Sequence, residues 1–147
     1  MRPLAGQLAV SLDALAELDS LYACARFAIE FDCAPVELLS TSRGMRVIGA
    51  RHPLLLAQGV AVVPFTLELE EGERTLLVSG PNTGGKTVLL KTVGLAVLLT
   101  QAGVPFPVAA GSAVPVLSKV FADIGDEQSI AQNLSTFSAH LRNIAAI

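Results

Sequence analysis

The segment that decides how this 147-residue chain is interpreted spans residues 80–87, Gly80-Pro81-Asn82-Thr83-Gly84-Gly85-Lys86-Thr87. It fits the pattern G-x-x-x-x-G-K-[ST] at every fixed position, and this pattern is typical of a loop that surrounds phosphate groups. The preceding residues 74–79 are apolar and β-prone, and residues 87–101 are apolar and compatible with a helix. We therefore predict a strand, a glycine-rich turn and the start of a helix, which is the context that such a loop requires.

The residue types in this loop suit a nucleoside triphosphate with Mg²⁺. Gly80 and Gly85 lack a Cβ, so the backbone can adopt positive φ and approach phosphates closely. The helix beginning near Lys86 would direct N–H groups and its positive dipole end at the anion. Lys86 would reach the β- and γ-phosphates, and the Thr87 hydroxyl would take one Mg²⁺ position. The residues predicted to bind ATP or ADP are Gly80, Pro81, Asn82, Thr83, Gly84, Gly85, Lys86, Thr87 and Val88. The alternative is a glycine turn that joins a strand to a helix by chance.

The composition is apolar for a free-standing domain. Hydrophobic residues make up 52% of the chain and charged residues 16%, against typical values of about 45–50% and 25%. We therefore expect either that both faces of a sheet are covered or that some of this surface meets another domain or chain. The length fits one domain, or one domain with a helical appendage. The net charge of −3 provides no basic patch, so these residues are not expected to form the main DNA contact of a DNA-binding protein.

Two features bear on the compartment. Cys24 and Cys33 have neither a metal-binding nor a redox spacing, and no signal peptide is visible, which favours reduced thiols in a cytoplasmic protein. Residues 92–118 carry no charge, but they contain several glycines and prolines that would break a spanning helix. We therefore expect no membrane span.

Periodicity predicts a helical arm followed by an α/β unit. Apolar residues at three- and four-residue steps predict a helix over about residues 7–31, ended before Pro35. Beyond it we predict a strand over 45–50 and a hairpin of Val62–Leu69 with Thr75–Val78. A helix is predicted from the loop to Gln101, with Gly103 just beyond its end. A buried strand over Val114–Ala122 and a helix that starts at Ser135-Thr136 complete the predicted elements. The boundaries drawn from this pattern separate a helical arm at residues 1–40 from an α/β domain at residues 41–147.

A phosphate loop that serves hydrolysis needs an acidic side chain after a second apolar strand. Asp123 follows a short apolar run, and Asp126 and Glu127 lie close behind it. Against this assignment, Lys119 interrupts the apolar run and a glycine follows almost at once. A polar loop that caps the next element is the commoner role of such a cluster. The residues alone leave both interpretations open.

Several motifs together resemble one family. The loop is followed by two further motifs, Asp123-Ile124-Gly125-Asp126-Glu127-Gln128-Ser129 and Leu134-Ser135-Thr136-Phe137-Ser138. This combination, with Asn82 after Gly80-Pro81, resembles the ATPase domain of the MutS family. The Thr83-Gly84-Gly85-Lys86-Thr87 variant and the aspartate-rich motif are most similar to the MutS-II branch.

Residues ahead of the loop extend the resemblance. Arg51-His52-Pro53-Leu54 and Val63-Pro64 match the family's approach to the loop, whereas Phe65-Thr66 departs from the Asn-Asp that is usual there. This departure puts in doubt any contact from that segment to a nucleotide base. The resemblance covers about residues 43–147 well and the first helix more loosely.

The resemblance implies an α/β fold of the P-loop NTPase type found in ABC and MutS ATPases, with a partial mixed sheet, flanking helices and a preceding helical arm. Residues 1–40 would be the end of the clamp or lever helices, and residues 41–147 part of the ATPase domain. It further implies that the acidic strand, the Walker B element, follows the Ser-Thr-Phe helix. Asp123 is then not the hydrolytic acid, and the chain is expected to end before that strand. No catalytic residue is assigned, the question of whether the chain is itself an enzyme stays open, and we expect nucleotide contact with negligible turnover.

The resemblance also gives Ser135 and Thr136 a role across a dimer. In this family a serine at a helix start faces the γ-phosphate bound by the second subunit, and a hydroxyl beside helix N-terminal amides suits an anion. The residues alone favour a plain helix N-cap, and the two roles are compatible. His52 and His140 have no second ligand nearby in sequence, which favours packing or surface roles over metal binding.

The function implied by the resemblance is nucleotide binding within a DNA-binding ATPase of DNA repair and recombination control. The implied partners are a second copy through the ATPase domain, branched or recombining DNA for the full-length protein and, in some members, stalled ribosomes. One alternative is a non-catalytic fragment that self-associates through apolar surface with an unoccupied phosphate loop. Another is an ABC-type subunit, which ranks lower because the chain has no Leu-Ser-Gly-Gly-Gln signature.

Overall fold

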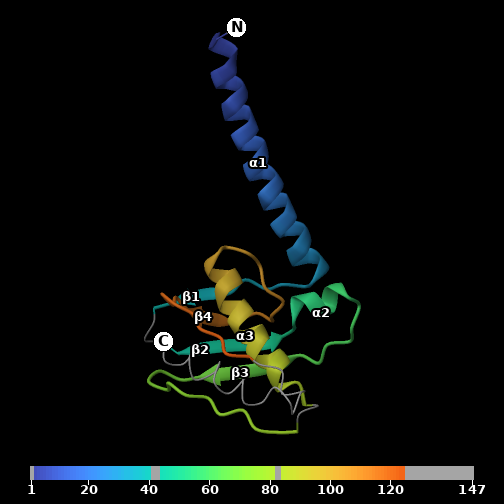
Figure 1. Cartoon of the computed structure of the whole chain (residues 1–147), viewed down its shortest axis with the longest axis vertical. Coiled ribbons are helices and arrows are strands. Elements are labelled where there is room, and N and C mark those ends of the chain that lie inside the picture. Colours follow the sequence, from blue (N-terminus) through green and yellow to red (C-terminus); the bar gives the residue numbers. More distant parts are fainter. Residues whose placement is uncertain (1, 41–43, 82–83, 125–147) are drawn as a thin grey trace, which may run out of the picture. The chain divides into compact units, whose positions relative to one another are not determined.

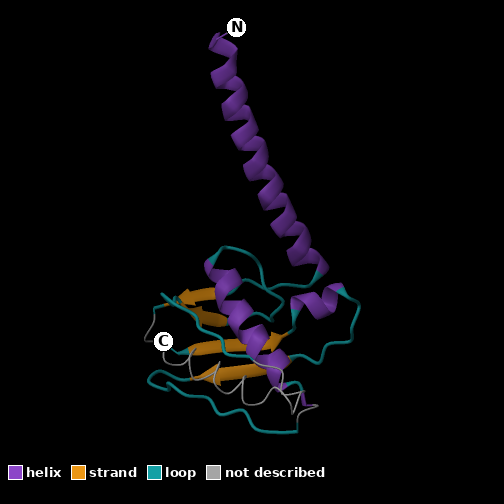
Figure 2. Cartoon of the chain, in the orientation of Figure 1, coloured by secondary structure: helices purple, strands orange, loops and turns teal. Residues whose placement is uncertain are grey.

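The structure is a computed structural model that describes residues 2–40, 44–81 and 84–124. Its elements are, in chain order, α1 (Arg2–Glu30), β1 (Glu37–Leu39), β2 (Met45–Ala50), α2 (Pro53–Ala57), β3 (Phe65–Leu69), α3 (Lys86–Gln101) and β4 (Ala113–Pro115) (Figure 1). Helices and a mixed four-stranded sheet confirm the expected α/β class (Figure 2). Contacts divide the chain into the units Met1–Val116 and Leu117–Ile147. In the second unit, residues 117–124 contain no helix or strand.

Helix α1 ends before Pro35, as the sequence predicts. Asp32 turns the chain out of the helix with a φ of 50°. The Arg51 guanidinium donates to the carbonyl oxygens of Phe31, at 2.8 Å, and of Asp32, at 3.1 Å. A cation therefore meets the carbonyl-rich end of the helix, where positive charge is stabilising.

The sheet has the strand order β1-β4-β2-β3, in which β1 and β4 are parallel and the other two pairs are antiparallel. The predicted hairpin of Val62–Leu69 with Thr75–Val78 is therefore wrong, because β3 pairs with β2 and residues 73–79 form no strand. The β2–β3 register places Val47 opposite Leu67, and both side chains are buried, whereas Leu77 is 89% exposed. Burial of apolar surface thus selects the distant partner over the near one.

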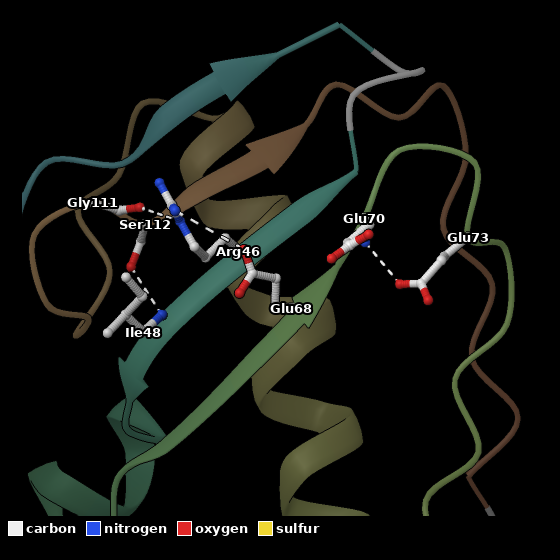
Figure 3. Close-up of polar contacts among 7 residues, drawn as sticks. All are labelled: Arg46, Ile48, Glu68, Glu70, Glu73, Gly111 and Ser112. Carbon is white, nitrogen blue, oxygen red and sulfur yellow. Dashed lines mark hydrogen bonds and ion pairs between the residues drawn. The ribbon is translucent and has the colours of Figure 1, made fainter.

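Two hydrogen bonds between Glu70 and Glu73 close the turn that follows β3. The Glu73 N–H donates to the Glu70 carbonyl at 3.1 Å, and the Glu73 carboxylate accepts from the Glu70 N–H at 2.8 Å (Figure 3). Residues 74–79, which were expected to form the strand that enters the glycine loop, run onward without regular pairing. The described residues consequently form a small mixed sheet and not a complete P-loop sheet.

An irregularity between Val47 and Ala50 interrupts the β2–β3 ladder. At this point the Gly49 N–H donates to the Thr66 hydroxyl at 3.1 Å, so a side chain satisfies a backbone donor that the ladder leaves unpaired. Thr66, which departs from the family pattern, therefore has a structural role here.

Side chains also join β2 to the segment before β4. The Ser112 hydroxyl accepts from the Ile48 N–H at 3.0 Å, while Arg46 donates to the Gly111 carbonyl at 3.0 Å and lies 4.0 Å from the Glu68 carboxylate (Figure 3). Strand β4 is shorter than the predicted Val114–Ala122. Its parallel partner β1 ends at Leu39, whose carbonyl accepts from the Val116 N–H at 3.0 Å.

Helix α3 lies along the sheet and packs against β4 (Figure 1). Its buried positions, Thr92, Ala96 and Val97, recur at four- and one-residue steps and form one face of the helix. Among the described residues, the buried apolar side chains are Val47, Ala50, Leu67, Ala96, Val97, Phe106, Val108, Ala113 and Val114. This core holds α3, and with it the end of the glycine loop, against the sheet.

Candidate functional site

The candidate site lies where the glycine loop enters α3. Gly80 has a φ of 151°, and Gly85, which caps the N-terminus of α3, has a φ of 73° in the left-handed region. A Cβ added to either residue would meet nothing within 4 Å. Backbone conformation rather than crowding is therefore what requires glycine at these positions. The Gly84 N–H donates to the Pro81 carbonyl at 3.0 Å.

Lys86 is the first residue of α3, and its side chain reaches back to the loop. The ammonium Nζ donates to the Pro81 carbonyl at 2.9 Å and to the Gly80 carbonyl. Thr87 and Val88 follow, and both are exposed. The first turn of α3 contains no acidic residue. A cation and a helix N-terminus therefore act together at the loop, an arrangement that favours an anion.

A buried histidine, His52, lies near Lys91 in the second turn of α3. His52 is 8% exposed, and its Nδ1 has no hydrogen-bond partner among the described atoms. Burial and, secondarily, the nearby positive charge of Lys91 lower the pKa of His52 below its ordinary 6.5. The neutral ring is thus a packing group, in line with the role expected from the sequence. The Thr92 hydroxyl donates to the Val88 carbonyl at 2.6 Å, so this buried donor has its hydrogen-bond partner within the helix.

The structure does not describe every predicted site residue. Those outside the described residues are Asn82, Thr83, Asp126, Glu127, Ser135, Thr136 and His140. Asp123 is exposed, and residues 116–124 form no strand, so the apolar strand of the acidic-site interpretation is not formed here. Within the described part of the chain, no group of three metal-ligating side chains occurs. A metal ion held by Thr87 would therefore need oxygens from a bound phosphate.

The structure also describes both cysteines and the uncharged segment at residues 92–118. Cys24 and Cys33 form no disulfide, and burial raises the pKa of the Cys33 thiol to about 11. No described helix has the length and apolar character needed to cross a bilayer.

Sequence reasoning missed the residues that connect this site to the rest of the fold. Arg51 was noted only within a motif, yet it ties the end of α1 to the end of β2, and its own N–H donates to the Pro107 carbonyl at 3.0 Å. Lys91 was not singled out, although its charge acts on His52. Each role joins residues that are distant in sequence, so no local spacing reveals it.

The fold and the site define an α/β protein with a glycine-rich loop at the N-terminus of a sheet-packed helix. Residues 76–147 match the family model described as MutS domain V. The chain is 57% identical over 147 residues to the Endonuclease MutS2 of Gemmatimonas aurantiaca, which covers 100% of this chain and 18% of that protein. These matches support the MutS family for this chain.

Two further relatives agree with that assignment. The Endonuclease MutS2 of Geobacillus kaustophilus is 50% identical over 141 residues, covering 95% of this chain and 18% of the relative. That of Finegoldia magna is 49% identical over 138 residues, covering 94% of this chain and 17% of the relative. The chain therefore spans less than a fifth of the length of these curated relatives.

Proposed function

We propose that this chain is the nucleotide-binding part of a MutS-family protein of DNA repair or recombination, and that residues 80–88 bind ATP or ADP with Mg²⁺. The observation that carries the proposal is the junction between the loop and α3. Gly85 adopts the left-handed conformation that lets the helix begin at Lys86, and the first turn presents a lysine and a threonine without any acid. Unpaired N–H groups at a helix start and an adjacent ammonium are the groups that bind phosphate.

Lys86 must change partners when a phosphate binds. Its ammonium donates to the carbonyls of Gly80 and Pro81, and these neutral acceptors are weaker than a charged phosphate oxygen. Exchange of the carbonyls for a β- or γ-phosphate is therefore favourable and needs only a rotation of a flexible side chain. The exposed Thr87 hydroxyl then supplies one ligand to Mg²⁺, and phosphate oxygens and water supply the others.

The wider proposals concern the longer protein. The relatives are named Endonuclease MutS2, which supports DNA as a partner, and by resemblance we propose that this DNA is branched or recombining. By resemblance we also propose a complete P-loop NTPase fold and a homodimer through the ATPase domain, in which Ser135 and Thr136 face the nucleotide of the second subunit. Stalled ribosomes, a cytoplasmic location and ATP hydrolysis by the whole protein stay predictions of the same kind.

Isothermal titration calorimetry with a non-hydrolysable ATP analogue and Mg²⁺ tests the nucleotide proposal. The parent chain should bind with micromolar affinity, and Lys86→Ala should weaken binding by about 10- to 100-fold, because a hydrogen bond between charged groups contributes about 1.5–3 kcal/mol. Lys91→Ala removes the same charge from the next turns of the same helix and is the matched control, expected to bind within about twofold of the parent. Absence of binding by the parent, or equal losses in the two variants, would refute the proposal.

A further inference from the structure

The connection between α1 and β1, residues 31–36, contains a strained residue. Asp32 has a φ of 50° and is the only non-glycine residue with a positive φ in the described part of the chain. Residues with a side chain are disfavoured in this left-handed region. Strained backbone of this kind persists only where the surrounding structure holds it in place. The contacts around Asp32 therefore indicate what keeps the connection in this conformation.

The Arg51 side chain makes the contacts that hold Asp32. Its Nη2 donates to the carbonyl oxygens of Phe31, at 2.8 Å, and of Asp32, at 3.1 Å, and lies 3.8 Å from the Asp32 carboxylate. The Arg51 backbone is fixed in turn, because its N–H donates to the Pro107 carbonyl at 3.0 Å. Hydrogen bonds from a charged donor are stronger than those between neutral groups. Arg51 therefore bridges the sheet to the residues just past α1.

The chain on either side of Asp32 is anchored without Arg51. Before it, the Phe31 N–H donates to a carbonyl one turn earlier at 3.0 Å and continues the helical pattern. After it, the Ala34 N–H donates to the Val108 carbonyl at 3.1 Å, which fixes the chain beside the sheet. A change of φ and ψ at Asp32 and Cys33 would redirect α1 and leave both of these anchors intact.

The packing beside the connection leaves room for such a change. A cavity of about 320 Å³ is lined by the last turns of α1 and α3 and by the segments that follow them, with Ala28, Cys33, Thr100 and Phe106 among its walls. Close-packed side chains resist displacement, whereas atoms that face a cavity lack partners on that side. The element pairs that pack extensively in the described structure do not include α1. Packing therefore does little to oppose movement of this helix.

We propose that residues 31–34 form a hinge for α1 and that Arg51 holds this hinge closed. In the closed state the guanidinium bonds two carbonyl oxygens and Asp32 stays left-handed. Loss of these bonds lets Asp32 relax to a negative φ, and α1 then changes its direction. Hinges are typically a few residues at the end of an element that absorb large φ and ψ changes. The hinge needs no nucleotide at residues 80–88, so it stands or falls separately from the proposed function.

Double electron–electron resonance on the full chain tests the hinge. Spin labels are attached to Leu12→Cys and Leu98→Cys, two exposed positions on α1 and α3, in a Cys24→Ser, Cys33→Ser background. Dilution with unlabelled chain suppresses distances between copies. Arg51→Gln should spread the label distances over roughly 9 Å more, because a kink of about 20° moves a label by that much when about 27 Å of helix separates it from the hinge.

Arg46→Gln is the matched control. Arg46 is also an arginine of the β2 segment that donates to a backbone carbonyl, that of Gly111 at 3.0 Å, and its carboxylate neighbour is Glu68. Its loss should leave the label distances unchanged. Arg51→Lys keeps the charge without the planar fork that bonds two carbonyls, so it should broaden the distances less than Arg51→Gln. If Arg51→Gln unfolds the sheet, Arg51→Lys is compared with Arg46→Gln by the same criterion.

Hydrogen–deuterium exchange separates the hinge from general instability. Arg51→Gln should speed exchange of the Asp32 and Cys33 amides by roughly tenfold, as expected for loss of charged hydrogen bonds, and leave peptides of residues 45–50 protected. Adding Asp32→Gly should slow that exchange again, because glycine adopts the left-handed φ without strain. Unchanged label distances in Arg51→Gln with a folded sheet would overturn the proposal. So would equal broadening by Arg46→Gln, or no rescue by Asp32→Gly.

Discussion

Substitution of Gly44 by alanine is predicted to destabilise the sheet through a backbone clash. Gly44 precedes β2 with a φ of 77°. A Cβ built on it would lie far inside van der Waals contact of the Leu69 carbonyl oxygen and 3.0 Å from the Glu70 carbonyl carbon. Leu69 is the residue paired with Met45 at the first position of the β2–β3 ladder. The clash therefore falls on backbone that cannot move without loss of register.

The loss of unfolding free energy expected for Gly44→Ala has two parts. An alanine in the left-handed region costs about 1–2 kcal/mol. Forcing an extra methyl group against packed atoms costs about 1–3 kcal/mol more. Gly44→Ala should therefore lower the free energy of unfolding by about 2–5 kcal/mol. Gly59 has a φ of 70° and nothing within 4 Å of a built Cβ, so Gly59→Ala should show only the first part, about 1–2 kcal/mol.

The assay must report on the sheet, because α1 contributes much of any helical signal. Urea unfolding gives the overall stability, and hydrogen–deuterium exchange with mass spectrometry resolves peptides that contain residues 45–50 and 65–69. Gly44→Ala should lower the midpoint and speed exchange in both peptides, and Gly59→Ala should change them much less. Equal losses in the two variants would show that the left-handed φ alone accounts for the effect and would refute the clash.

Two predictions follow from titratable groups. Burial raises the pKa of Cys33 to about 11, so its alkylation at pH 8 should be at least about tenfold slower in the folded chain than in the urea-unfolded chain; equal rates by peptide mass spectrometry would contradict the burial. Burial and Lys91 lower the pKa of His52 below 6.5, so the unfolded chain binds this proton more readily and stability should fall as the pH drops below about 6.5. His52→Phe should reduce that fall in urea midpoint between pH 7.5 and pH 5, and an unchanged pH dependence would exclude His52 as its source.

Helices α1 and α3 were predictable because their signals are local, whereas α2 (Pro53–Ala57) was not predicted. Alpha-helix periodicity and Pro35 predict α1 and its end. The glycine loop predicts the start of α3 at Lys86, and its end near Gln101 is set by Gly103 and the residue after it. The Gly103 N–H donates to the Thr100 carbonyl at 3.0 Å, and the Val104 N–H to the Leu99 carbonyl at 2.9 Å. This pair of bonds satisfies the last carbonyls with residues that are adjacent in sequence.

The strand partners were not predictable by the same means. Residues 75–78 are β-prone and follow a turn after β3, so the nearest-neighbour expectation was a hairpin. The partner that β3 takes is decided instead by burial of Val47 against Leu67, and the irregularity in that ladder is completed by the Thr66 hydroxyl. Each of these is a choice between surfaces distant in sequence. The intrinsic β-propensity of a residue does not say which strand its own strand will pair with.

The candidate site depends both on local sequence signals and on contacts between residues that are distant in sequence. The types and spacing of Gly80, Gly85, Lys86 and Thr87 are local, and they suffice to predict what the loop would bind. How tightly it binds depends on contacts that the spacing does not contain. In the proposed complex Lys86 would give up its contacts to two carbonyl oxygens. Helix α3 holds the loop's end only as firmly as its buried face packs on β4. A variant that loosens this packing should therefore weaken nucleotide binding even though every residue of the motif is intact.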